Sequence, residues 1–220
     1  MVGATRSAQK AQLRGCGLLC FFSCLMKRIG FGVVFCALLA CRSGGSDHKC
    51  VSAIELASTR HSSLGANSDP AKAREDSVIG ACIAYCQWGD PTVRAAHDQW
   101  KRDNPSSPAT SESILTIHVK QQVSACQVRC DAAAKSGAAP VKTECAAGSK
   151  SNCRADLSHG GKPATGTGKD RFEAQHVACR AWCTANDAES AKSSFMLAGC
   201  ASRCNGDVMF GSSTVKISCS

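Results

Sequence analysis

The sequence predicts a small, disulfide-rich, all-α fold in which two helical-hairpin modules follow each other in tandem, with long loops. Three observations lead to this prediction. Seventeen of the 220 residues are cysteine, and the twelve that follow residue 41 fall into two similarly spaced sets of six. Each set contains two Cys-x3-Cys pairs. Aromatic residues make up only 5% of the chain, so we expect a thin core that depends on covalent links.

The chemistry of these cysteines depends on the cellular compartment, because disulfides form in oxidising compartments and free thiols persist elsewhere. A basic pair, Lys27-Arg28, precedes an apolar run over residues 29–40, and small residues lead into Cys41. This order is typical of a signal peptide. The run is about half of the ~20 residues that span a bilayer, so a transmembrane helix is the weaker interpretation.

The end of the apolar run, Leu38-Leu39-Ala40-Cys41, resembles the lipobox of bacterial lipoproteins. That resemblance implies that a diacylglyceryl group is attached to the Cys41 thiol, that the signal is removed just before it, and that the new amino terminus is acylated, usually with palmitate. In Gram-negative members, Asp directly after the lipidated Cys favours retention in the inner membrane. Arg42 stands here instead, which implies the outer membrane, with the lipid as the membrane contact.

The resemblance also sets the expected boundaries at the start of the chain. We expect a signal peptide over 26–40, with the lipidated Cys and a polar tether over 41–49. Residues 1–25 make an unusually long leader, and we interpret them as an artefact of the start site, with Met26 as the true start. Two alternatives stay open: an ordinary signal peptide with chance cysteines, or a membrane hairpin interrupted by Lys27-Arg28.

The twelve later cysteines indicate an internal duplication. Each set reads as a single Cys, two Cys-x3-Cys pairs and a second single Cys, and the last gap is fourteen residues in both. An aromatic residue, Tyr85 or Trp182, and an arginine, Arg129 or Arg203, recur at equivalent positions. We therefore expect a first module over 50–145, a linker over 146–152 and a second module over 153–220.

Helix geometry gives the Cys-x3-Cys spacing a meaning, because residues i and i+4 lie on one face of a helix. Two antiparallel helices with such pairs can be joined by two disulfide rungs. Six cysteines allow fifteen connectivities, and the antiparallel arrangement selects one for each module. The expected pairs are Cys82–Cys130, Cys86–Cys126 and Cys50–Cys145 in the first module, and Cys179–Cys204, Cys183–Cys200 and Cys153–Cys219 in the second.

Local signals refine this prediction. Asp90 and Pro91 are a typical helix start, which predicts an extra helix between the paired cysteines of the first module, with Trp100 near its end. Asn205-Gly206 predicts the end of the last helix. Two segments rich in Gly, Ser and Pro, over 61–70 and 158–168, are expected to be loops.

The twin Cys-x3-Cys hairpin resembles two known groups, the plant α-hairpinin peptides and the small Tim chaperones of mitochondria. The α-hairpinins include protease inhibitors and antimicrobial peptides. The likeness covers only the hairpins, and a shared staple pattern does not imply a shared function.

Several classes of function are disfavoured. Without the five basic residues that precede Cys41, 21 basic face 17 acidic side chains, a net charge of +4 that is too small and dispersed for binding nucleic acid. Motifs and spacings typical of catalysis do not occur, so we expect no enzyme and no cofactor. A zinc site built from facing cysteines would need reduced thiols, so disulfides are favoured over metal binding.

The sequence therefore leads to a lipid-anchored protein of the cell envelope that acts by binding or as a structural element, with an unknown protein or envelope partner. Trp88 and Trp100 border the first connector and are candidate partner contacts, although they are equally suited to a small local core. A protease inhibitor or antimicrobial-type hairpin protein is the alternative, with the connector 184–194 inserted in a protease cleft. A metal-binding envelope protein is a further alternative.

Overall fold

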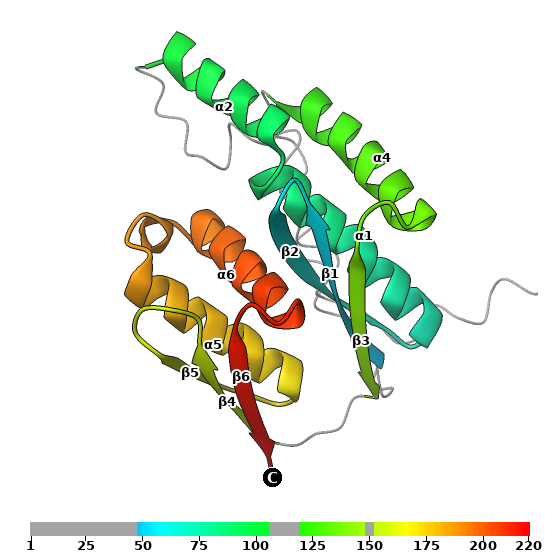
Figure 1. Ribbon diagram of the computed structural model, residues 1–220, viewed down its shortest axis with the longest axis vertical. Helices are drawn as coiled ribbons and strands as arrows, with labels where there is room; N and C mark the ends of the chain where they lie inside the picture. The colour runs from blue at the N-terminus through cyan, green and yellow to red at the C-terminus, as the bar shows by residue number, and fades with distance from the viewer. Residues whose placement is uncertain (1–47, 106–118, 148–151) are drawn as a thin grey trace, which may run out of the picture. The chain divides into compact units, whose positions relative to one another are not determined.

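The computed structural model describes residues 48–105, 119–147 and 152–220. The expected signal peptide, Cys41 and most of the tether lie outside these residues. These described residues belong to one compact unit, and its elements are shown in Figure 1.

The first module is a three-stranded antiparallel sheet packed against a long helix. β1 (His48–Leu56) and β2 (Thr59–Asn67) form a hairpin, α1 (Pro70–Trp88) and α2 (Pro91–Asp103) follow, and α4 (Lys120–Ser136) leads into β3 (Val141–Ala147). The strand order is β2-β1-β3. Asp69 caps α1 and Asp90 caps α2, with Pro at the start of both helices, so the extra helix predicted from Asp90 and Pro91 is confirmed.

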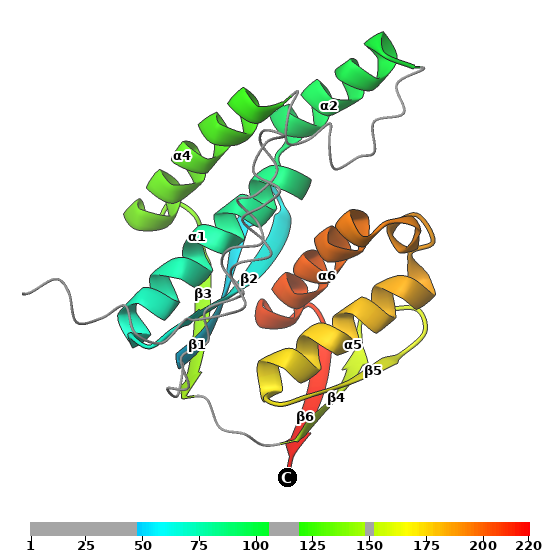
Figure 2. The same ribbon diagram turned by 180° about the vertical axis from the view of Figure 1, so that it is seen from behind.

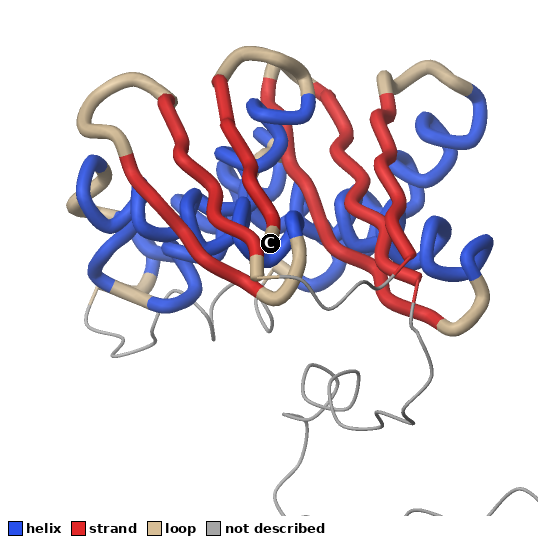
Figure 3. The backbone as a smooth tube through the Cα atoms, turned by 90° about the horizontal axis from the view of Figure 1, so that it is seen from below, coloured by secondary structure: helices blue, strands red, loops and turns tan. Residues whose placement is uncertain are grey.

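The second module repeats this topology. β4 (Cys153–Ser158) and β5 (Ala164–Gly168) form a hairpin, α5 (Arg171–Asn186), η1 (Ser190–Lys192) and α6 (Ser194–Met209) follow, and β6 (Thr214–Cys219) returns to the sheet. The order β5-β4-β6 matches that of the first sheet. The short helix η1 stands where the first module has α2. Figure 2 shows both modules from behind, and Figure 3 shows their strands in red against the blue helices.

The all-α prediction is wrong, because each module holds a β-sheet beside its helical hairpin. The segments over 61–70 and 158–168, expected to be loops, contain most of β2 and all of β5. Small residues fill these strands because α1 and α5 lie almost directly on them. A Cβ placed on Gly65 would be 2.3 Å from the Ala73 carbonyl oxygen, and one on Gly166 would be 2.2 Å from the Ala178 amide nitrogen.

Six disulfides hold the modules, and they join the same pairs that the antiparallel geometry selects: Cys50–Cys145, Cys82–Cys130, Cys86–Cys126, Cys153–Cys219, Cys179–Cys204 and Cys183–Cys200. Four are rungs between helices, with Cα atoms 5.6 to 6.1 Å apart. The other two link directly opposed residues of adjacent strands, with Cα atoms 4.0 Å apart. The rungs tie each helix to its hairpin partner, whereas the strand disulfides close each module at its ends.

The buried cores are thin. Cysteine and alanine supply most of the buried apolar residues in both modules, and Ile54 and Leu157 are the largest side chains that are almost completely buried. Buried hydroxyls also contribute: Ser52 Oγ lies 2.7 Å from Ser77 Oγ and 2.8 Å from Thr143 Oγ1, so sheet and helix are joined by hydrogen bonds. A core of this composition offers little apolar area per residue, which is why covalent links matter here.

Replacing Gly65 tests the close approach of α1 to β2. Gly65→Val forces the new side chain into the backbone at Ala73 and Ser77, and overpacking of this kind costs about 1–3 kcal/mol. We expect a loss of about 2 kcal/mol in the free energy of unfolding, measured by urea denaturation. Ala66→Val, at the exposed neighbouring position, is the matched control and should be nearly neutral. Equal effects of both changes would contradict this packing.

Candidate functional site

The three residues singled out for function have different positions. Cys41 lies outside the described residues. Trp88 is the last residue of α1, and Trp100 lies on α2. Within the described part of the chain, no helix combines the length and apolar character needed to cross a membrane.

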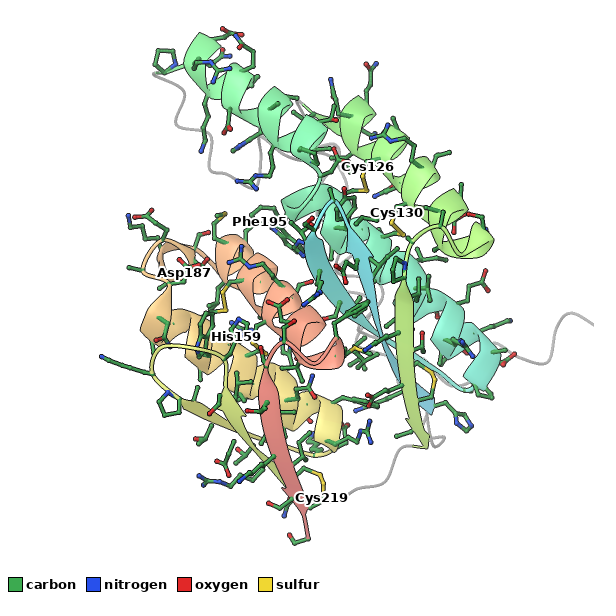
Figure 4. The ribbon with its side chains drawn as sticks, in the orientation of Figure 1. Cys126, Cys130, His159, Asp187, Phe195 and Cys219 are labelled. Atoms are coloured by element: carbon green, nitrogen blue, oxygen red, sulfur yellow. A yellow bond between two sulfur atoms is a disulfide. The ribbon has the colours of Figure 1, made fainter. Side chains whose placement is uncertain are left out.

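Trp88 contacts the second module. Its ring lies 5.2 Å from the ring of Phe195 on α6, and a Cβ on Gly199 of the same helix would be 2.7 Å from Trp88 Cδ1. Figure 4 labels Phe195 at the start of α6, on the side of that helix that faces the first module. The indole is therefore only partly exposed, and its nitrogen is buried without a hydrogen-bond partner among the described residues. Trp88 is thus a contact between modules in this structure.

His61 lies next to Trp88 and is 3% exposed. Its ring stacks on Trp88 with centroids 6.5 Å apart and meets the edge of Tyr85 at 6.3 Å. Burial, together with the positive charge of Arg203, lowers the pKa of His61 to about 4. The imidazole is therefore neutral at physiological pH and belongs to the packed contact between α1, β2 and α6.

A serine pair joins the two modules beside His61. The Ser62 amide donates to Ser202 Oγ at 3.1 Å, and the same hydroxyl donates to the Ser62 carbonyl at 2.8 Å. In return, Ser62 Oγ donates to the Ser202 carbonyl at 3.0 Å. β2 is an edge strand of its sheet. Its outer backbone groups would otherwise be open to pairing with another strand, and α6 covers them.

A polar cluster lies at the same contact. Asp207 Oδ1 is 3.6 Å from Arg60 Nη1, and Asp207 Oδ2 is 3.6 Å from His159 Nε2. His159 Nδ1 makes a hydrogen bond with Ser213. A Ser-His-Asp chain is the arrangement of serine hydrolases, but the Asp207 carboxylate is shared with Arg60. The cluster joins Asp207 on α6 to strand β2, to the turn between β4 and β5, and to the residue before β6.

The connectors between paired helices are held in the same way in both modules. Asp90 accepts hydrogen bonds from the first amides of α2 and lies 3.5 Å from Arg129 Nη2. Asp187 accepts from the Ser190 amide and hydroxyl, which lowers its pKa, and lies 3.9 Å from Arg203 Nη2. The recurring arginines thus face a connector aspartate. The sequence indicates this arrangement, because Asp90 and Asp187 follow the first Cys-x3-Cys pair of their modules at the same distance.

The connectors themselves differ most between the modules. In the first, α2 is a helix of 13 residues, whereas η1 in the second has three. Figure 1 shows α2 extending away from the sheet of its module. Val93 is fully buried, Ala96, His97 and Trp100 are partly buried, and most other side chains of α2 are exposed. Trp100 is therefore on the inner stripe of α2, while the outer face is polar.

The cysteines of the described residues offer no thiolate, because all twelve are in disulfides. Over residues 48–105, 119–147 and 152–220, no group of three or more His, Cys, Asp or Glu side chains is arranged to hold a metal ion. The connector 184–194, on which the inhibitor hypothesis depends, is compact: it holds the end of α5, the Asp187 turn and η1.

No known protein family, characterised protein or solved structure matches this chain.

Proposed function

We propose that this is an exported, lipid-anchored protein of the cell envelope that acts by binding a partner, without catalysis. One observation carries the proposal: twelve cysteines form six disulfides, and all eight that make the rungs are at most 4% exposed. A small protein stabilised in this way belongs to an oxidising compartment. The signal peptide expected over 26–40 directs export, and Cys41 at the end of the lipobox-like Leu38-Leu39-Ala40-Cys41 carries the lipid anchor.

The difference between the two modules supports a place for binding. They share one scaffold, but between the paired helices the first module has α2, of 13 residues, where the second has only η1, of three. Rigid scaffolds commonly present their binding residues on such variable connectors. The exposed outer face of α2, with Arg94, Gln99 and Arg102, is therefore the proposed contact, supported from behind by Val93 and Trp100.

The anchor is tested by Cys41→Ser. We expect the wild-type protein in the membrane fraction, with an intact mass equal to a chain that starts at Cys41, carries acyl groups and lacks twelve thiol hydrogens. The variant should be uncleaved and without lipid. Ser46→Ala, in the tether, is the control and should leave both fraction and lipid unchanged. A mature chain that starts at any other residue would refute the lipid anchor.

Binding through α2 is tested by photo-crosslinking in cells. A photoreactive amino acid at Gln99, on the exposed face of α2, should give a discrete crosslinked product. The same amino acid at Ala191, exposed on η1, is the matched control and should give none. Crosslinks at both positions, or at neither, would contradict the assignment of the contact to α2.

A further inference from the structure

β3 forms an open edge of the first sheet. The strand order is β2-β1-β3, and the opposite edge, at β2, is covered by α6 through Ser62 and Ser202. Figure 1 shows β3 at the margin of its sheet, on the side away from β2 and α6. β3 is seven residues long, and neither a proline nor a bulge interrupts its register with β1. A regular edge of this kind is a template for another strand.

The hydrogen bonds between β1 and β3 show which backbone groups of β3 point outward. The Glu55 amide donates to the Pro140 carbonyl at 3.0 Å. Along an antiparallel strand, the amides and carbonyls of alternate residues point to opposite neighbours. Residues an even number of positions after Pro140 therefore bond to β1. The backbone groups that point away from the sheet are those of Val141, Thr143 and Cys145.

The charged side chains make this edge complementary to itself. A second β3, antiparallel and centred on Thr143, would place Lys142 opposite Glu144 of the other copy, and Glu144 opposite its Lys142. These would be the pairs without backbone hydrogen bonds, in which facing side chains lie closest. Both side chains are exposed on the surface of one chain. There Lys142 Nζ lies 4.9 Å from the centre of the Phe210 ring, and Glu144 pairs with Arg171.

The equivalent strand of the second module is not self-complementary. β6 is also an edge strand, and its register with β4 places Lys216 where the first module has Lys142. Ser218, however, stands where the first module has Glu144. Two β6 strands would therefore form no pair of opposite charge in this register, and β3 with β6 would form one. Two β3 strands form two such pairs, so the charges favour β3 with β3.

We propose that two copies of this chain associate through an antiparallel pair of β3 strands. The two copies of the β2-β1-β3 sheet then form one continuous sheet, with a two-fold axis at Thr143. A contact in which the same surface is used by both copies is closed, so assembly stops at the dimer. Pairing also removes the open edge from each sheet. This contact depends neither on the lipid anchor nor on the contact proposed at α2.

Charge variants test the pairing, with dimerisation of the purified full-length protein measured by sedimentation equilibrium in density-matched detergent. Lys142→Glu and Glu144→Lys each place two pairs of like charge across the strands, and each should weaken dimerisation about tenfold. An equimolar mixture of the two variants should restore it, because every facing pair is again opposite in charge. Lys216→Glu, at the equivalent position of β6, is the matched control and should dimerise like the wild type.

Rescue in the mixture separates strand pairing from damage to the fold, because a misfolded variant is not restored by another variant. A chain that carries both Lys142→Glu and Glu144→Lys should also dimerise like the wild type. A wild-type protein that stays monomeric at every concentration would overturn the proposal, and so would single variants that are not rescued by mixing. Loss of dimerisation in Lys216→Glu would place the contact at β6 and would overturn it as well.

Discussion

The first module has two disulfide rungs between its helices. Removing one of them should lower the free energy of unfolding much less than removing the other one afterwards. Cys82–Cys130 and Cys86–Cys126 join the same two helices one turn apart. While one rung remains, the other closes a ring of only about ten residues. It then stabilises the folded state by about 2.5 kcal/mol, because it restricts the unfolded chain. Once it is gone, the remaining rung closes a loop of 48 residues, worth about 4 kcal/mol.

The expected values follow from this order of removal. Cys86→Ala with Cys126→Ala, or Cys82→Ala with Cys130→Ala, should lower the free energy of unfolding by about 2.5 kcal/mol each. All four substitutions together should lower it by about 6.5 kcal/mol, more than the sum of the two pairs. Since many small domains are stable by only about 5–15 kcal/mol, this variant should be close to unfolded.

Guanidinium denaturation without reductant, followed by far-ultraviolet circular dichroism, measures the three variants against the wild type. The second module is the internal comparison, because its rungs, Cys179–Cys204 and Cys183–Cys200, close loops of 25 and 17 residues. Loss of both should cost less there than in the first module. Strictly additive losses in the first module would show that the two rungs do not restrict the same loop.

The helices were predictable because a local rule governs them. Cysteines at i and i+4 lie on one face, and Asp90 before Pro91 marks a helix start whatever the rest of the chain does. Local rules also misled at Gly206, predicted to end the last helix. α6 runs on to Met209, and Gly206 is needed instead for close packing, since a Cβ there would be 2.9 Å from the Arg60 carbonyl carbon.

The sheets were harder to predict because their strands depend on distant partners. β2 and β5 are rich in Ser, Thr and Gly, and these residues are typical of loops as well as of strands covered closely by a helix. The segment Cys153–Ser158 did indicate a strand, because apolar and polar residues alternate through it, and the structure buries every second side chain. The contact of Trp88 and His61 with α6 depends on tertiary packing, which no local pattern indicates.

Acid should weaken the contact between the modules through His61. Its pKa is about 4 in the folded protein, against about 6.5 in an unfolded chain. Below pH 6.5 the unfolded chain binds a proton that the folded protein does not, so stability falls as pH drops from about 6.5 to 4 and then levels off. A difference of this size corresponds to about 3 kcal/mol over that window.

His61→Phe removes the titrating group and keeps an aromatic ring against Trp88 and Tyr85. We expect the variant to retain stability near that of the wild type at pH 7 and to lose about 3 kcal/mol less between pH 7 and pH 4. His48→Gln, on β1 and only partly buried, is the control and should keep the acid sensitivity of the wild type. Urea denaturation at several pH values gives each slope. A wild-type slope in His61→Phe would place the acid-sensitive group elsewhere and would remove His61 from the account of how β2 and α6 are held together.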